Sequence, residues 1–133
     1  MSLGKDKMDN LAREIIIDYY RHPRNKGRLE NPTISHEEKN PTCGDIVRLD
    51  LLVEDDRVKE VRFDGYGCSI SQASASMLTE MVQGKTMDEV RQISKDDILD
   101  TLGIQLGPAR LKCALLGLKV LKTGAYGLHG WNL

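Results

Sequence analysis

The sequence predicts an α+β domain, in which helices pack on one face of a three-stranded antiparallel sheet. Alternation of apolar and polar residues is concentrated in residues 33–64, helical patterns fill the chain from residue 69 onward, and one more helical pattern precedes the strands. A length of 133 residues fits one domain. We therefore expect a single domain over residues 1–133, with residues 1–7 as a cloning remnant or disordered segment and residues 124–133 as a tail.

The composition excludes several classes of protein. With 40% hydrophobic and 29% charged residues, the chain is neither disordered nor fibrous. Its 19 Lys and Arg against 20 Asp and Glu give a formal net charge of -1, which argues against a strongly basic surface for nucleic acid. No apolar run approaches the roughly 18 residues of a membrane span, and residues 1–7 lack the apolar stretch of a secretory signal. We expect a cytoplasmic protein, whose thiols stay reduced, without nucleic-acid or membrane partners.

The first helix is predicted from apolar residues that recur at helical spacing between Met8 and Tyr19. It should end near His22, because Pro23 disfavours a helical residue before it. Residues 24–32 contain Asn, Gly and Pro and are expected to form a loop.

Three strands should follow this loop. Residues 33–39 are expected to form a short edge strand, and residues 47–53 alternate as a half-buried strand does. The polar residues 54–57 predict a turn, after which residues 58–64 close a hairpin.

The remaining chain predicts four helices. The first spans Ser69–Val82, with Ser69 and Gln72 as a capping box and Gly84 at its end. Shorter helices are expected over residues 86–91, where Thr86 and Glu89 repeat the capping signal, and over residues 95–101. The last helix is expected over residues 109–122, with Pro108 in its first turn and Gly124 after its end.

Three cysteines, Cys43, Cys68 and Cys113, carry the candidate chemistry. They form no CxxC pair and no local zinc knuckle, so they lie separately in the core or converge in the fold. Taken singly, each is more simply a small buried hydrophobe, Cys113 above all because its helix is apolar. Cys43 fits that role least, since it lies in a polar turn, and Asp45 alone could simply cap that turn.

The local surroundings of each cysteine favour a reactive or metal-binding role. Cys43 and Asp45 can reach one ion across Gly44, whose neighbourhood is stiffened by a proline. Cys68 directly precedes a helix, where backbone N–H groups favour a thiolate. Cys113 has Arg110 on its own helix face and Lys112 beside it, and both cations could offset negative charge.

Three thiolates and one carboxylate would complete a tetrahedral set for zinc or for iron in a cluster. The oxygen of Asp45 is a harder ligand than sulfur, so it would hold a soft metal centre less tightly. A site built for storage or electron transfer would use four cysteines. One labile ligand instead suits a site that passes its contents on.

Three segments together resemble the U-type iron–sulfur assembly proteins, a family that includes IscU, SufU and the N-terminal domain of NifU. The resemblance runs from about Leu11 to Lys122. The motifs are Asn40-Pro41-Thr42-Cys43-Gly44-Asp45, the segment from Gly65 to Ser76 that contains Cys68, and Pro108-Ala109-Arg110-Leu111-Lys112-Cys113.

This resemblance implies that Cys43, Cys68 and Cys113 converge with Asp45 at one exposed end of the molecule. It also implies that a cysteine desulfurase delivers sulfur as a persulfide. The IscU branch builds a [2Fe–2S] cluster and hands it to apo iron–sulfur proteins, whereas the SufU branch binds Zn2+ and relays sulfur. Cys43 and Cys113 are the candidate persulfide acceptors, and mobile loops around both should let the thiol leave the site.

The chain combines features of both branches. The serine-rich segment after Cys68 and Ala109-Arg110-Leu111-Lys112-Cys113 resemble SufU, and Lys112 stands where IscU proteins have a histidine. The extra segment typical of SufU is absent, because only 44 residues separate Cys68 from Cys113. Three hypotheses follow: a cluster scaffold, a zinc-dependent sulfurtransferase, and an interaction module with a purely structural zinc.

Overall fold

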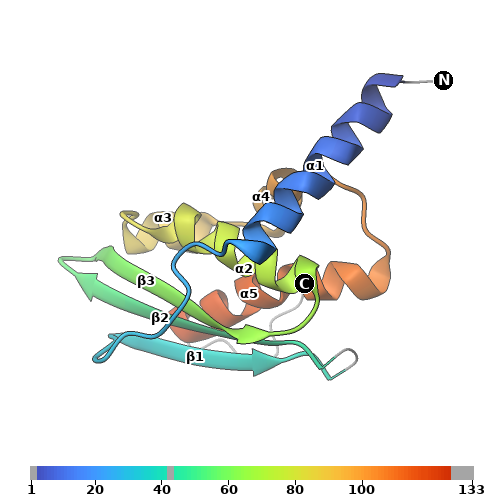
Figure 1. The fold of residues 1–133 in the computed structure, drawn as a ribbon. Helices are drawn as coiled ribbons and strands as arrows, with labels where there is room; N and C mark the ends of the chain where they lie inside the picture. Colours follow the sequence, from blue (N-terminus) through green and yellow to red (C-terminus); the bar gives the residue numbers. More distant parts are fainter. Residues whose placement is uncertain (1–2, 42–43, 127–133) are drawn as a thin grey trace.

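The computed structural model describes residues 3–41 and 44–126 and confirms the predicted α+β architecture. The elements, in chain order, are α1 (Leu3–Arg21), β1 (Ile34–Lys39), β2 (Ile46–Glu54), β3 (Arg57–Tyr66), α2 (Ser69–Val82), α3 (Met87–Gln92), α4 (Lys95–Leu102) and α5 (Pro108–Tyr126). The strands form one antiparallel sheet in the order β1-β2-β3, and the helices gather on one side of it (Figure 1).

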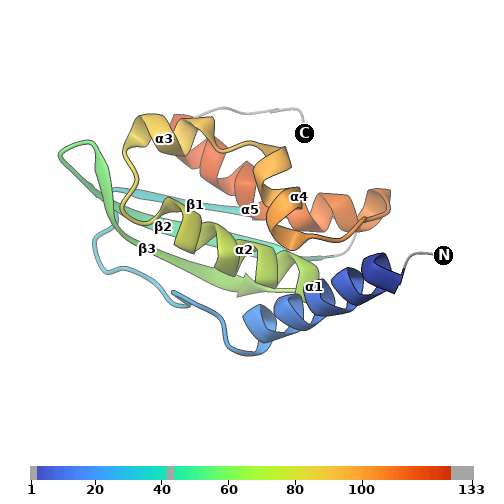
Figure 2. The ribbon, with the colours of Figure 1, turned by 90° about the horizontal axis from the view of Figure 1, so that it is seen from above.

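The helices α2 and α5 form the layer that covers the sheet. Helix α2 packs on β3, while α5 packs on β1 and β2. Seen from above, α2 lies between α1 and α5 (Figure 2). The core lies between these layers, and the sheet contributes its alternate residues, such as Leu49 and Phe63, both almost fully buried. Burial of one face of each strand therefore explains the alternation in the sequence.

The turn between β2 and β3 is a two-residue hairpin connection, Asp55-Asp56, inside the predicted turn of residues 54–57. Both residues have positive φ, 52° and 61°. Turns of this kind match the twist of the flanking strands, and Asp tolerates positive φ better than most residues.

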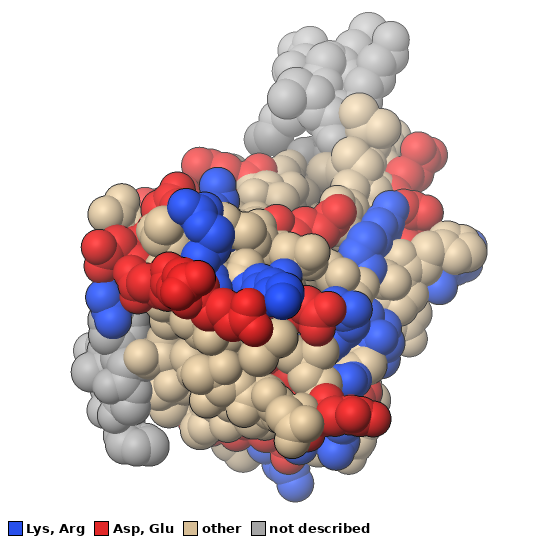
Figure 3. Space-filling model, turned by 90° about the vertical axis from the view of Figure 1, so that its left-hand side faces the viewer, with Lys and Arg blue, Asp and Glu red and all other residues tan. Residues whose placement is uncertain are grey.

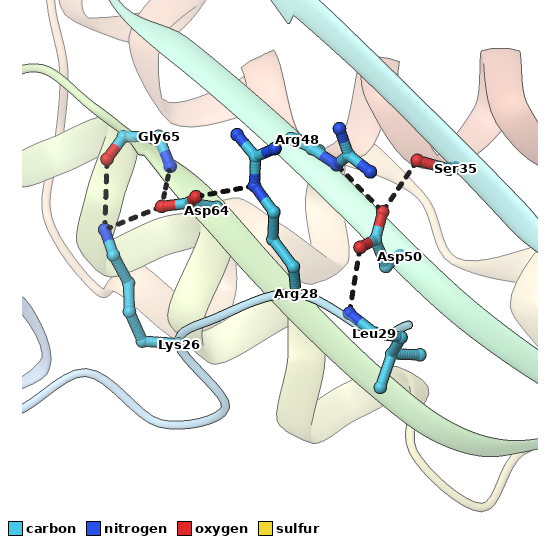
Figure 4. A network of polar contacts seen from close by, with 8 residues as sticks. All are labelled: Lys26, Arg28, Leu29, Ser35, Arg48, Asp50, Asp64 and Gly65. Carbon is cyan, nitrogen blue, oxygen red and sulfur yellow. Dashed lines mark hydrogen bonds and ion pairs between the residues drawn. The ribbon is translucent and has the colours of Figure 1, made fainter. Parts of the chain in front are cut away.

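The segment between α1 and β1 crosses the sheet face that the helices leave open. Asn25 and Gly27 exchange backbone hydrogen bonds with Phe63 of β3, and further on the Leu29 N–H donates to the Asp50 carboxylate of β2 over 3.0 Å. Figure 4 shows this segment pinned to Asp64 and Asp50 by its polar contacts. The loop therefore buries part of the outer sheet surface and fixes the end of α1.

The helix boundaries differ from the sequence prediction at both ends of the chain. Helix α1 begins at Leu3, so it includes most of residues 1–7, and it ends at Arg21 as expected. Helix α5 continues to Tyr126, so the prediction that it stops at residue 122 with Gly124 after its end was wrong. Gly124 instead lies inside the helix and packs on β1, where an added Cβ would stand 3.1 Å from side-chain atoms of Ile34 and His36. Residues 127–133, most of the expected tail, lie outside the described residues.

The predicted capping boxes have mixed outcomes. Thr86 and Glu89 form the expected box at α3, and Ser94 with Asp97 forms one at α4 that the sequence analysis had not named. The box proposed for Ser69 and Gln72 was wrong, since Ser69 is already the first helical residue and Cys68 is the N-cap without a side-chain cap. The physical reason is that an acceptor from another part of the chain, Asp45, takes the Cys68 N–H.

Within the part of the chain described, no helix combines the length and apolar character that a membrane span requires. The face at the left of Figure 1 carries acidic and basic side chains mixed together (Figure 3). This mixture agrees with the nearly balanced charge of the sequence.

Candidate metal centre

Three of the four predicted ligands come together in the fold. The Asp45 carboxylate and the Cys68 and Cys113 thiols each offer an atom, and these atoms all lie within 4.8 Å of one another. They come from the segment that enters β2, from the N-cap of α2 and from the early turns of α5. Residues separated by up to 68 positions in the sequence therefore meet at one end of the sheet.

Asp45 is held in place by the backbone of Cys68. Its Oδ1 accepts a hydrogen bond from the Cys68 N–H over 2.9 Å, and its Oδ2 lies 3.5 Å from the Cys68 Sγ, which donates to it as a thiol. Asp45 is 2% exposed, so this short side chain has little freedom. The contact fixes which carboxylate oxygen faces the thiols and satisfies a free N–H at the start of α2.

Cys113 forms the buried wall of the site. It is 5% exposed, and the Asn40 side-chain amide donates to its Sγ over 3.9 Å. Asn40 also closes the turn that leads into β2, because its N–H donates to the Asp45 carbonyl and its own carbonyl accepts from the Gly44 N–H. Asn40 thus connects the turn that contains Asp45 to Cys113 in α5.

An open cavity of about 450 Å³ borders both thiols. Its apolar walls come from α1, α2, the connection before α5 and the start of α5, and its lining residues are Arg13, Ile16, Ile17, Cys68, Ser69, Ile70, Ile104, Ala109, Arg110 and Cys113. Cys68 is exposed. The thiols are therefore accessible from outside, and the described lining carries two arginines and no carboxylate.

The other predicted site residues have separate outcomes. Cys43 lies outside the described residues. Arg110 lines the cavity together with Cys113, as its position on the same helix face predicts. Lys112 is exposed and is not among the described residues of the cavity wall. The expectation of a mobile loop around Cys113 was wrong, because Cys113 lies within α5.

Sequence reasoning missed several neighbours of the site. Arg13 and Ile104 line the cavity, and Asn40 contacts Cys113, although none of them was singled out. Asn40 stands at the start of the first motif, so that motif could have suggested it. Arg13 lies 55 residues before Cys68, and no local pattern signals that α1 borders this cavity.

Comparison with known proteins agrees with this geometry. The model of the NifU-like N terminal domain matches residues 11–131, a span that contains all three cysteine motifs. The chain belongs to this family. The resemblance read from the motifs is thereby confirmed.

Relatives of both branches are found within the family. The zinc-dependent sulfurtransferase SufU of Bacillus subtilis is 40% identical, with 94% of this chain and 96% of the relative covered. The iron–sulfur cluster assembly scaffold protein IscU of Thermotoga maritima is 38% identical, with 82% and 88% covered. Among solved structures, the putative SUF-system scaffold protein of Fervidobacterium islandicum superposes with a TM-score of 0.73 at 31% identity, over 84% of this chain and 94% of that one.

Proposed function

We propose that this NifU-like domain is a scaffold for iron–sulfur cluster assembly. It accepts sulfur from a cysteine desulfurase, holds a transient [2Fe–2S] cluster or metal ion on Cys43, Asp45, Cys68 and Cys113, and passes the cluster to apo iron–sulfur proteins. The observation that carries the proposal is the meeting of Asp45, Cys68 and Cys113 beside an open cavity. We propose the cytoplasm as its location, a compartment in which the thiols of the site would stay reduced.

The donor set fits a soft, roughly tetrahedral centre. A zinc–sulfur distance of about 2.3 Å implies ligand atoms about 3.8 Å apart. The three atoms lie within 4.8 Å of one another, so a shift of about 1 Å would bring them to that spacing. Two thiolates and a carboxylate suit zinc or iron, and not the hard cations that prefer oxygen ligands.

Cys43 is proposed as the fourth ligand on grounds of chain connectivity. Its neighbours Gly44 and Asp45 are held beside the site by the hydrogen bonds of Asn40. Two peptide units allow a Cα separation of at most about 7 Å between Cys43 and Asp45. Chain connectivity therefore allows the Cys43 thiol to serve as a ligand beside the other three donors.

Sulfur transfer to this chain is a thiol–persulfide exchange. The thiolate of Cys43 or Cys113 attacks the terminal sulfur of the desulfurase persulfide, a new S–S bond forms, the old one breaks, and the desulfurase cysteine leaves as a thiolate. The cavity beside Cys113 supplies the path to this otherwise buried sulfur. Arg13 and Arg110 in its wall favour the anionic nucleophile and the developing leaving group.

A zinc-dependent sulfurtransferase is the second candidate. The 40% identity to a protein of that name supports it, as does Lys112, which takes the place of a possible imidazole ligand. The length of that alignment argues against this candidate. It spans 142 positions, more than the 133 residues of this chain, so this chain lacks some residues that the relative has. Only residues 103–107 connect α4 to α5, a connection too short to hold an extra segment.

A purely structural zinc is the least supported hypothesis. Structural sites are closed by their protein ligands, and the metal then contributes much of the folding free energy. Here Cys68 is exposed, and the cavity opens directly onto two donors. An interaction module would have no use for this access.

The deciding experiment is anaerobic purification followed by reconstitution with a cysteine desulfurase, cysteine and ferrous iron. The scaffold predicts visible absorption with acid-labile sulfide, and both should disappear in Cys68→Ser. Stoichiometric zinc, sulfide-free protein after reconstitution and persulfide on Cys43 or Cys113 would instead identify the relay. A chain that binds neither iron nor zinc and accepts no sulfur would refute both.

A further inference from the structure

Gly67, directly before Cys68, has no room for a side chain. A Cβ at this position would lie 2.1 Å from the Asp45 Oδ1, 2.6 Å from its Cγ and 2.9 Å from its Cβ. All three nearest atoms belong to Asp45, so the missing side chain of Gly67 leaves space for the Asp45 side chain. No real Cβ approaches another heavy atom this closely without displacing it.

We infer that Gly67 is a positioning residue of the metal centre, an inference that rests on the function proposed above. Its lack of a Cβ lets the Asp45 carboxylate dock against the chain and accept the Cys68 N–H through Oδ1. The second oxygen, Oδ2, then points to the side where the Cys68 sulfur lies.

This arrangement determines how Asp45 acts as a ligand. One oxygen is engaged by the protein backbone, so the carboxylate offers a metal its other oxygen and coordinates through a single atom. Hydrogen bonds from the surrounding shell orient metal ligands, and removing such a partner typically costs about 10- to 100-fold in metal affinity. A methyl group at Gly67 would push the carboxylate off the N–H and remove this orientation.

Backbone strain must be separated from the steric contact. Gly67 has a φ of 149°, a conformation that L side chains rarely adopt, so alanine there would be strained even with free space around it. Gly84 provides the matched control, because its φ is 82° and an added Cβ would meet nothing within 4 Å. Gly84 lies after α2, outside the candidate metal centre.

The test is a double-mutant cycle on zinc affinity, measured by competition with a chromophoric chelator in the whole protein. We expect Gly67→Ala to weaken Zn2+ binding about 10- to 100-fold and Gly84→Ala to leave it unchanged. In an Asp45→Ala background the carboxylate is gone, so adding Gly67→Ala should change the affinity less than about threefold.

Thermal unfolding without metal gives a second readout. Asp45→Ala should restore part of the stability that Gly67→Ala loses, because it removes the side chain with which the new methyl clashes and leaves only the backbone strain. This readout remains available if Gly67→Ala alone does not fold. Equal losses of affinity in both backgrounds, or a double variant no more stable than Gly67→Ala, would overturn the inference. Wild-type protein that binds no Zn2+ would count against the proposed site itself, which is a different result.

Discussion

Asp45 is the residue on which the chemistry of this site depends most. It is the harder donor beside two sulfurs, and it is nearly fully buried, with one oxygen already held by the Cys68 N–H. The first property weakens its hold on a soft metal centre, because a carboxylate oxygen is a poorer partner for iron than a thiolate sulfur. The metal centre therefore has one ligand, Asp45, that can dissociate more readily than the cysteines.

Asp45→Ala is expected to slow release of a bound cluster. Without Asp45, only thiolates of the protein hold the cluster. Transfer to an apo acceptor then can no longer begin with dissociation of the weakest ligand. The rate can be timed by the absorption of an apo-ferredoxin as it fills. Glu54→Ala, an exposed carboxylate at the opposite end of β2, should transfer at the wild-type rate. An unchanged or faster rate for Asp45→Ala would contradict this expectation.

A second buried carboxylate, Asp50, stabilises the fold and lies on the outer sheet face (Figure 4). Burial alone would raise its pKa, but hydrogen bonds from the Ser35 hydroxyl, the Leu29 N–H and the Arg48 guanidinium together lower the pKa below its usual value. The charged form is thus favoured in the folded protein. Asp50 thereby attaches the loop after α1 to the sheet.

The stability contributed by Asp50 should be lost in acid. Because its pKa is lower folded than unfolded, the contribution is complete above the unfolded pKa of about 3.9 and disappears as the pH falls below it. Asp50→Asn should lower the free energy of unfolding by about 1.5–3 kcal/mol at neutral pH. It should also make this free energy depend less on pH between about pH 5 and 2. Urea unfolding at several pH values measures both effects. Asp55→Asn, in the exposed turn, should change neither quantity. If Asp50→Asn keeps the wild-type pH dependence of stability in acid, the stabilising role of Asp50 is refuted.

At the scale of the elements, α5 is buried on most sides, and its two inner glycines serve different contacts. At Gly117 an added Cβ would meet Ala75 and Leu78 of α2 at 3.5 Å, an ordinary contact distance. At Gly124 it would meet Ile34 and His36 of β1 at 3.1 Å, which requires the neighbours to move. An added methyl group therefore has less room at Gly124 than at Gly117.

Alanine at these two glycines should have different effects on stability. Alanine favours a helix interior over glycine by about 0.8–1.0 kcal/mol, so Gly117→Ala should raise the free energy of unfolding by roughly that amount. Gly124→Ala should gain less or destabilise, because crowding against β1 offsets the propensity. Chemical denaturation of the two variants side by side gives the comparison. An equal gain at both positions would mean that β1 does not restrict Gly124.

For the whole molecule, the candidate centre lies at one end of the domain, apart from most of the core. The core between the sheet and the helices buries a continuous cluster of large apolar side chains, including Leu49, Phe63, Leu78 and Leu118. Of the described donors, only Cys113 belongs to this cluster. Hydrophobic burial elsewhere should therefore maintain the fold without metal.

Removal of metal with a chelator should leave the domain folded. The far-UV circular dichroism is expected to stay unchanged, and the free energy of unfolding should fall only by the mass-action contribution of the bound ion, about 2.7 kcal/mol at a free metal concentration of 100 times Kd. Cys68→Ser, which weakens binding, should lose most of this difference between loaded and stripped protein. Cooperative unfolding on chelation would favour the structural zinc hypothesis instead.

The sequence by itself determined the order of the elements, the hairpin, the core-facing residues of the strands and the chemical type of the site. These features follow from local patterns, since period-two alternation, turn residues and the cysteine motifs each act over a few neighbouring positions. The motifs also identified the family, and the donors Asp45, Cys68 and Cys113 were named from them.

Only the tertiary structure decided how those donors meet. The cap of α2 comes from Asp45, 23 residues before Cys68, the room for that carboxylate comes from Gly67, and α1 supplies Arg13 to the cavity. Gly124 looked like a helix end, yet its lack of a side chain serves a contact with β1. These contacts join segments far apart in the chain, and their steric and hydrogen-bond requirements arise only once the packing has brought the segments together.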